Sequence, residues 1–225
     1  MVSRRWLNVP MGADEHDERR PGRPKDMAKR EAILTAARSL FFERGLDEVG
    51  IEEIAAAADV SKTTVYSNFD DKSAILGAVV SRESQRITLA LDPKTNDQQD
   101  FEQRLVDYGV VLLGFLTTPE LIAFDRLMAA AAARHPDMAK ALVEAGPRFS
   151  QRQLATCLDV GVAEGRVKIS DTYVAAGQLI ALWFGQMHME CRMGVRTQPS
   201  ASELEQHIRV GVSLVLQAYQ GVSKC

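Results

Sequence analysis

The chain has 225 residues, of which 46% are hydrophobic, 25% charged and only 6% aromatic, and its formal net charge is −3. These values are ordinary for a folded globular protein, and the length predicts one or two domains with a substantial core. They exclude a strongly basic protein that holds nucleic acid by bulk charge, since residues 1–90 carry 14 Lys and Arg against 15 Asp and Glu. Any binding of DNA must therefore depend on where individual charges are placed.

Residues 1–24 are polar, are interrupted by Pro and Gly, and show no apolar period, so we expect a flexible arm. No apolar signal region appears in it, and no apolar run in the chain reaches the ~18 residues of a membrane span. We therefore expect a cytoplasmic protein. Residues 19–25 (RRPGRPK) are basic, and through Arg23 and Lys25 they could enter a minor groove, where negative potential is concentrated. The alternative is a solvated leader.

A first helix is predicted over about residues 26–44. Its buried stripe is Ile33, Ala37, Leu40 and Phe41, at helical spacing, and Gly45 follows its end in the position that favours a left-handed residue. This helix is expected to lie behind the next two, as a three-helix domain requires.

Residues 50–69 predict two short helices, over 51–57 and 62–69, joined by a tight turn. A helix-turn-helix needs a small residue where the helices cross, a turn residue that tolerates positive φ four positions later, and an aliphatic residue six positions beyond. Ala55, Asp59 and Val65 meet these needs, because Asp accepts the left-handed region better than most residues. Ser61 is a good N-cap for the second helix. Gly50 and Glu53 form half a capping box.

The second helix of the motif carries donors and acceptors suited to phosphates and base edges. These candidate DNA contacts are Ser61, Lys62, Thr63, Thr64, Tyr66, Ser67 and Asn68. A plain helical hairpin in a bundle is the alternative interpretation of the motif taken alone.

The residues that flank the motif favour the first interpretation. Residues 24–80 resemble the N-terminal DNA-binding domain of the TetR family of transcriptional regulators. The matching residues are Ile33, Leu34, Ala36, Ala37, Leu40, Phe41, Gly45, Ile54, Ala55, Val60, Ser61, Lys62, Thr64, Val65, Tyr66, Phe69, Lys72 and Leu76. The resemblance implies that Lys72, at the start of a fourth helix, contacts a phosphate. Gly50 replaces the usual Thr, and Ser67 and Asn68 replace the usual Tyr and His, which leaves the operator sequence open.

The fourth helix is predicted to begin at the acidic caps Asp70 and Asp71 and to run toward Leu89, with a linker over residues 92–97. Residues 100–225 then predict helices over about 100–116, 118–134, 136–145, 147–164, 171–193 and 200–219, with breaks at Pro and Gly and no strand pattern. We therefore predict an all-α protein. Its parts are an arm (1–24), a helix-turn-helix domain (25–90, motif 50–69) and a C-terminal domain for effector binding and dimerisation (91–225).

The last two predicted helices are more apolar than a single core-facing stripe needs. Their apolar residues are Val174, Leu179, Leu182, Trp183 and Met187, then Ile208, Val212, Leu214, Val215 and Tyr219. In TetR-like proteins the matching helices pair with their copies, so the resemblance implies a homodimer. A dimer also suits a near-palindromic operator with half-sites about one DNA turn, roughly 34–36 Å, apart. The segments 123–128, 141 and 144–147 loosely resemble the AefR-like branch of the family.

Relatives in the family sense small molecules among the C-terminal helices. The candidate lining residues are Phe124, Met128, Trp183, Phe184, Met187 and His188. Flexible Met and flat aromatic side chains suit an adaptable apolar pocket. Plain core packing is the alternative for each of them, and a satisfied core histidine is the alternative for His188.

We therefore expect a sequence-specific regulator, a repressor released by an unidentified effector. An architectural protein that binds DNA without sequence preference is the alternative. An enzyme is not expected, because the sequence has no HExxH or GxSxG motif. The odd, scattered cysteines Cys157, Cys191 and Cys225 favour small buried hydrophobes over a metal or redox site, so no metal or cofactor is expected.

Overall fold

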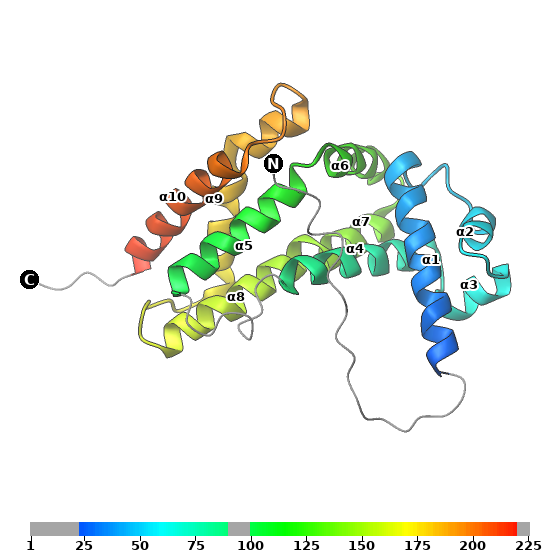
Figure 1. Ribbon diagram of the computed structural model, residues 1–225, viewed down its shortest axis with the longest axis horizontal. Helices are drawn as coiled ribbons and strands as arrows, with labels where there is room; N and C mark the ends of the chain where they lie inside the picture. The colour runs from blue at the N-terminus through cyan, green and yellow to red at the C-terminus, as the bar shows by residue number, and fades with distance from the viewer. Residues whose placement is uncertain (1–22, 90–99, 220–225) are drawn as a thin grey trace, which may run out of the picture.

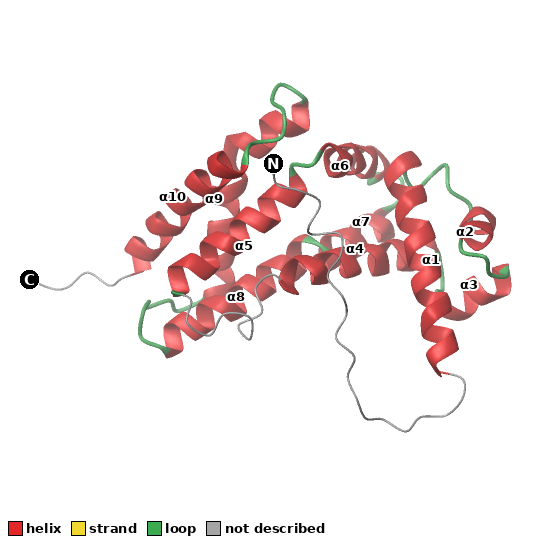
Figure 2. Cartoon of the chain, viewed as in Figure 1, coloured by secondary structure: helices red, strands yellow, loops and turns green. Residues whose placement is uncertain are grey.

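The structure is a computed structural model that describes residues 23–89 and 100–219, and every regular element in these ranges is an α-helix (Figures 1 and 2). The helices are α1 (Arg23–Arg44), α2 (Ile51–Ala57), α3 (Lys62–Asn68), α4 (Lys72–Leu89), α5 (Phe101–Leu116), α6 (Pro119–Ala131), α7 (Pro136–Ala145), α8 (Pro147–Ala163), α9 (Thr172–Met193) and α10 (Ala201–Tyr219). The predicted all-α fold is confirmed. The predicted arm up to residue 22, the linker and Cys225 lie outside the described residues.

Several helix boundaries differ from the sequence prediction, and those of α1, α3 and α6 have a clear physical reason. Helix α1 begins at Arg23 rather than near Asp26, because Pro24 is tolerated in a first turn, where its missing N–H has no partner to lose. Helix α3 ends at Asn68, and the C-cap Phe69 turns into the core instead. Helix α6 ends at Ala131 rather than near residue 134. Its successor begins at Pro136, which disfavours a helical conformation in the residue before it, and His135 is non-helical there (φ −129°, ψ 72°).

The largest departure is a break inside α9. Gly185 has φ 41° and ψ −148°, a region essentially reserved for glycine, although a Cβ there would meet nothing within 4 Å. Glycine is therefore required by the backbone conformation at this position and not by a lack of space for a side chain. The break lies next to the carbonyl oxygen of Trp183, which accepts a hydrogen bond from His207 Nε2 on α10 at 2.8 Å if that nitrogen carries the proton. No proline marks this kink in the sequence.

The buried apolar side chains form two clusters. The proximal cluster joins residues of α1–α4 to residues of α6 and α7, including Phe124, Met128 and Met138. The distal cluster joins α5, α8, α9 and α10, and takes only Ile87 from the N-terminal part of the described chain. Helix α4 enters both clusters, with Val79 in the first and Ile87 in the second. In Figure 1 the helix-turn-helix lies at one end of the molecule and α9 and α10 lie at the other.

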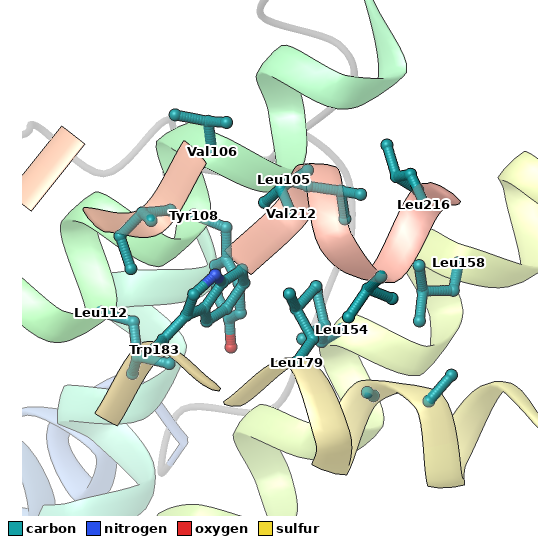
Figure 3. Packing of buried hydrophobic residues seen from close by; sticks show 14 of the residues in the cluster. Leu105, Val106, Tyr108, Leu112, Leu154, Leu158, Leu179, Trp183, Val212 and Leu216 are labelled. Atoms are coloured by element: carbon teal, nitrogen blue, oxygen red, sulfur yellow. The ribbon is translucent and has the colours of Figure 1, made fainter. Parts of the chain in front are cut away.

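The centre of the distal cluster is Trp183, whose side chain is 1% exposed. Its ring meets Tyr108 edge-on, with centroids 6.2 Å apart, as Figure 3 shows. Two helices approach the ring through glycines, because a Cβ at Gly109 would lie 3.0 Å from Trp183 Cε2 and one at Gly211 would lie 3.1 Å from Cδ1. No single helix in the described ranges is long and apolar enough to span a membrane. Helices α5 and α6 reach that threshold only as a pair, bent by 67°.

Candidate nucleic-acid interface

Helices α2 and α3 form the predicted helix-turn-helix. Ala55 is 4% exposed and Val65 is fully buried, and the turn between the helices contains Asp59 with φ 53°. Asp59 is the one residue other than glycine with positive φ in the described ranges. The N–H of Val60 donates to the carbonyl oxygen of Ala55 at 3.0 Å and closes the end of α2. The three-residue spacing rule therefore predicted this turn correctly.

Both predicted caps of the motif are confirmed. Ser61 Oγ accepts from the N–H of Thr64 at 3.1 Å and lies 2.9 Å from Thr64 Oγ1. At the start of α2, Glu53 Oε2 accepts from the N–H of Gly50 at 2.8 Å. The same Glu53 side chain pairs with Arg44 at 3.0 Å, which ties α2 to the end of α1. The cap interactions fix the start of α3 relative to the turn.

The candidate DNA contacts of α3 fall into two groups. Lys62, Thr63 and Tyr66 are exposed, and half of the surface of Tyr66 is open to solvent. Ser67 Oγ and Asn68 Nδ2 both donate to the carbonyl oxygen of Thr64, each at 2.9 Å, so the hydroxyl donor of Ser67 and one of the two amide donors of Asn68 are used within the helix. A hydroxyl or amide so engaged still has acceptor lone pairs to offer to DNA. The first group is the more available for phosphates and base edges.

The candidate cations near the motif are also engaged. Lys62 Nζ bonds Glu52 Oε1 across the motif and lies 5.9 Å from the centre of the Tyr66 ring. This pairing lowers the pKa of Glu52 and raises the pKa of Lys62. Lys72 Nζ donates to the carbonyl oxygens of Leu46 and Val49, at 2.6 and 2.9 Å, which holds the loop before α2 against the start of α4.

Two other candidate cations, Arg23 and Lys25, lie in the first turn of α1, and their side chains are outside the described residues. Arg30 is placed over the ring of Phe69, 4.7 Å from its centre. The phosphate contact that the family resemblance implied for Lys72 stays a prediction. The structure adds a second role for that side chain, as a clamp on the loop before α2.

The proximal cluster fixes the motif to the rest of the protein. Phe42 of α1 stacks on Phe124 of α6, with ring centroids 4.2 Å apart and planes 15° from parallel. Arg38 lies 4.5 Å from the centre of the Phe42 ring and pairs with Glu83 of α4 at 3.3 Å and Glu120 of α6 at 3.1 Å. A second link joins the loop after α1 to the connection between α6 and α7, because Asp47 pairs with Arg134 at 2.7 Å and contacts His135 at 2.5 Å. Motion of α6 or α7 would therefore reach the motif.

The six candidate effector-lining residues do not meet in one place. Phe124 and Met128 are buried in the proximal cluster, where Phe124 stacks on Phe42. Trp183, Phe184 and Met187 belong to or lie against the distal cluster. The sequence could not separate the two sets, because apolar side chains at helical spacing look alike whichever neighbour they face.

Two polar groups at these positions lack strong partners. The buried Trp183 Nε1 has no hydrogen-bond partner within the described part of the chain. His188 is half-buried against the ring of Phe184, at 4.8 Å between centroids, and burial lowers the pKa of this histidine. Among the described residues no three His, Cys, Asp or Glu side chains are grouped as metal ligands would be. Cys157 and Cys191 are free thiols, and burial raises the pKa of each.

Two family models match the chain. The model of bacterial regulatory proteins of the tetR family matches residues 33–79, and the model of the AefR-like transcriptional repressor C-terminal domain matches residues 103–221. The chain is also 34% identical over 110 residues to an uncharacterized HTH-type transcriptional regulator, YdeS, of Bacillus subtilis. That match covers 48% of this chain and 52% of YdeS, so the chain spans about half the length of this relative.

Solved structures match over a larger share of the chain. A TetR-family transcriptional regulator from Mesorhizobium loti aligns with a TM-score of 0.72 at 28% identity, over 87% of this chain and 98% of that one. The flavonoid-responsive regulator FrrA aligns with a TM-score of 0.69 at the same identity and coverage. The N-terminal and C-terminal halves seen here therefore recur together in one arrangement.

Proposed function

Because the chain belongs to the TetR family of transcriptional regulators, we propose that it is a sequence-specific repressor that leaves its operator when a small-molecule effector binds. The observation that carries the proposal is the helix-turn-helix, in which α3 presents Lys62, Thr63 and Tyr66 outward while Val65 is buried beneath them. Side chains of this kind on an exposed helix can reach base edges and phosphates in a major groove. The match to an AefR-like repressor domain supports repression rather than activation.

The repressor acts as a homodimer through α9 and α10. Several apolar side chains on these helices face solvent, among them Val174 (49% exposed), Leu182 (43%), Val210 (56%) and Leu214 (53%). Val210 and Leu214 are one turn apart, and Val174 and Leu182 are two turns apart, so each helix carries an exposed apolar stripe. Exposed apolar stripes on two adjacent helices favour pairing with a second copy about a two-fold axis.

Analytical ultracentrifugation tests the dimer directly. The double variant Leu182→Glu/Leu214→Glu is expected to sediment as a monomer and to lose operator binding, because four carboxylates would meet at the interface. Val160→Glu is the matched control, since Val160 is 39% exposed on α8, outside the last two helices. A double variant that remains dimeric would place the interface elsewhere.

The effector binds among the C-terminal helices. The buried indole N–H of Trp183, which has no partner among the described residues, offers a donor to a polar atom of a ligand that enters there. The structural similarity to a flavonoid-responsive regulator supports a flat aromatic effector. Effector binding would shift the dimer toward a spacing of the two α3 helices that fits the operator poorly.

Selection of bound duplexes from a random pool at about physiological salt tests the proposal as a whole. A near-palindrome with half-sites about one turn apart is expected, and the effector search then measures release from that duplex, beginning with flavonoids. If no sequence is enriched and binding collapses with modest salt, the protein is an architectural DNA-binding protein instead.

A further inference from the structure

The segment that would face DNA is acidic. Between residues 46 and 72 there are two cations, Lys62 and Lys72. The same segment has seven acids, Asp47, Glu48, Glu52, Glu53, Asp59, Asp70 and Asp71. Affinity for DNA of any sequence comes mainly from cations that neutralise phosphates, and nearby carboxylates oppose it. This segment therefore provides little attraction for DNA beyond its two lysines.

Both lysines already have partners. Lys72 donates to two backbone carbonyl oxygens, which fixes it as part of the scaffold. Lys62 bonds Glu52, and it is the first residue of α3, so its side chain lies at the edge that would meet a phosphate. Lys62 Nζ has further N–H donors to offer, but a phosphate that binds it must share the charge of Lys62 with Glu52.

Glu52 is placed to compete in this way. It lies in the first turn of α2, and its side chain is 68% exposed, while that of Lys62 is 51% exposed. Both groups are open to solvent, so the pair can separate without a rearrangement of the core. A glutamate carboxylate is ionised at neutral pH, and the hydrogen bond with Lys62 lowers the pKa of Glu52 further. Glu53, the next residue, instead binds the N–H of Gly50 and Arg44.

We propose that Glu52 competes with DNA phosphates for Lys62 and thereby lowers the affinity of the protein for DNA of every sequence. The inference rests on the proposed function only in that the motif binds DNA through α3. Its consequence is weaker binding to operator and non-operator DNA alike, while the preference between them, which comes from base contacts, is unchanged. An exposed ion pair of this kind contributes little free energy, so Glu52 is expected to reduce DNA affinity by a small factor and not to abolish binding.

Glu52→Gln tests the proposal, because it removes the charge and keeps the size of the side chain. The full-length protein is titrated with a fluorescent operator duplex and with a scrambled duplex of equal length, across a range of salt. The dissociation constants for both duplexes are expected to fall about two- to fivefold at low salt, and the gain is expected to shrink as salt rises. The ratio of the dissociation constants for the two duplexes is expected to be the same in the variant and in the parent protein.

A double-mutant cycle with Lys62→Gln identifies the route of the effect. If Glu52 acts by holding Lys62, Glu52→Gln has little effect on DNA affinity once Lys62 is replaced. An equal gain in that background would mean that Glu52 simply repels phosphates, and the proposal would be wrong. A loss of operator binding alone would mean that Glu52 reads a base, which would also overturn it.

Glu164→Gln is the matched control for the change in net charge. Glu164 pairs with Arg166 at 2.7 Å, its side chain is 43% exposed, and it is the C-cap residue of α8, a helix that lies outside the helix-turn-helix. The Glu164→Gln variant is expected to bind DNA with the same affinity as the parent protein. Failure of the proposed function would appear separately, as a parent protein that prefers no duplex, whereas the Glu52 proposal is judged from the change between variant and parent on any duplex.

Discussion

The two core clusters differ in which parts of the sequence contribute their residues. The distal cluster is built almost entirely from residues after position 100, and its helices are long. The proximal cluster contains the short helices of the DNA-binding motif, and it is completed by Phe124, Met128 and Met138 from α6 and α7. Two helices of seven residues each cannot bury enough apolar surface alone, so they pack on α1, and α1 packs in turn on α6 from the second half of the chain.

The motif and the C-terminal half are therefore joined through a shared hydrophobic core. The Phe42–Phe124 stack and the Arg38 pairs connect α1 to α4 and α6. Phe115 and Leu116 of α5 pack against both clusters. The two clusters are therefore expected to unfold together.

The largest expected effect is that of Trp183→Ala in the distal cluster. The fully buried ring leaves a large cavity, so the free energy of unfolding is expected to fall by about 3–5 kcal/mol. Urea denaturation followed by circular dichroism measures it, and hydrogen exchange at α1 shows whether the proximal cluster is weakened too. One transition, with faster exchange in both clusters, is expected. Two separate transitions would show that the clusters are independent.

The matched control is Trp183→Phe. It keeps most of the ring and removes the indole N–H that has no partner within the described residues. We expect it to lose less than half as much stability as Trp183→Ala, because a buried donor without an acceptor is itself destabilising. An equal loss would mean that the N–H is satisfied in solution.

Gly185→Ala tests the kink that shapes the distal cluster. A residue with a Cβ at φ 41°, ψ −148° is expected to lower the free energy of unfolding by about 1–3 kcal/mol. Gly114→Ala is the control, because Gly114 lies in α5 and its Cβ would come no closer than 3.4 Å to Leu204 Cδ1. It is expected to be neutral or slightly stabilising. If both substitutions behave alike in thermal melting, the break is not fixed in solution.

The smallest expected effect concerns the aromatic stack that links the DNA-binding motif to the C-terminal half. In a double-mutant cycle of Phe42→Leu and Phe124→Leu, the coupling energy is expected to be about 0.5–1.5 kcal/mol, the usual value for a stacked aromatic pair. The same four proteins are titrated with operator DNA. If the two side chains are coupled in stability but the four proteins need the same effector concentration for release from DNA, this stack does not transmit effector binding to the DNA-binding motif.

Much of the motif could be predicted from the sequence because its determinants are local. The turn at Asp59, the cap at Ser61 and the half box at Gly50 and Glu53 each depend on residues within a few positions of one another. The helix starts at Pro119, Pro136 and Pro147 were equally readable, since proline restricts its own φ and that of the residue before it. The kink at Gly185 was not, because glycine inside a helical pattern permits a break without requiring one.

Local sequence patterns were therefore sufficient to predict the all-α class, the helix-turn-helix and the resemblance to the family. The folded structure was needed to show which core Phe124 and Trp183 enter, that Lys72 clamps a loop, and that Glu52 holds Lys62. These are contacts between residues distant in the sequence or on different helices. Periodicity reports that a side chain is buried or exposed, but it does not report the neighbour that buries or binds it.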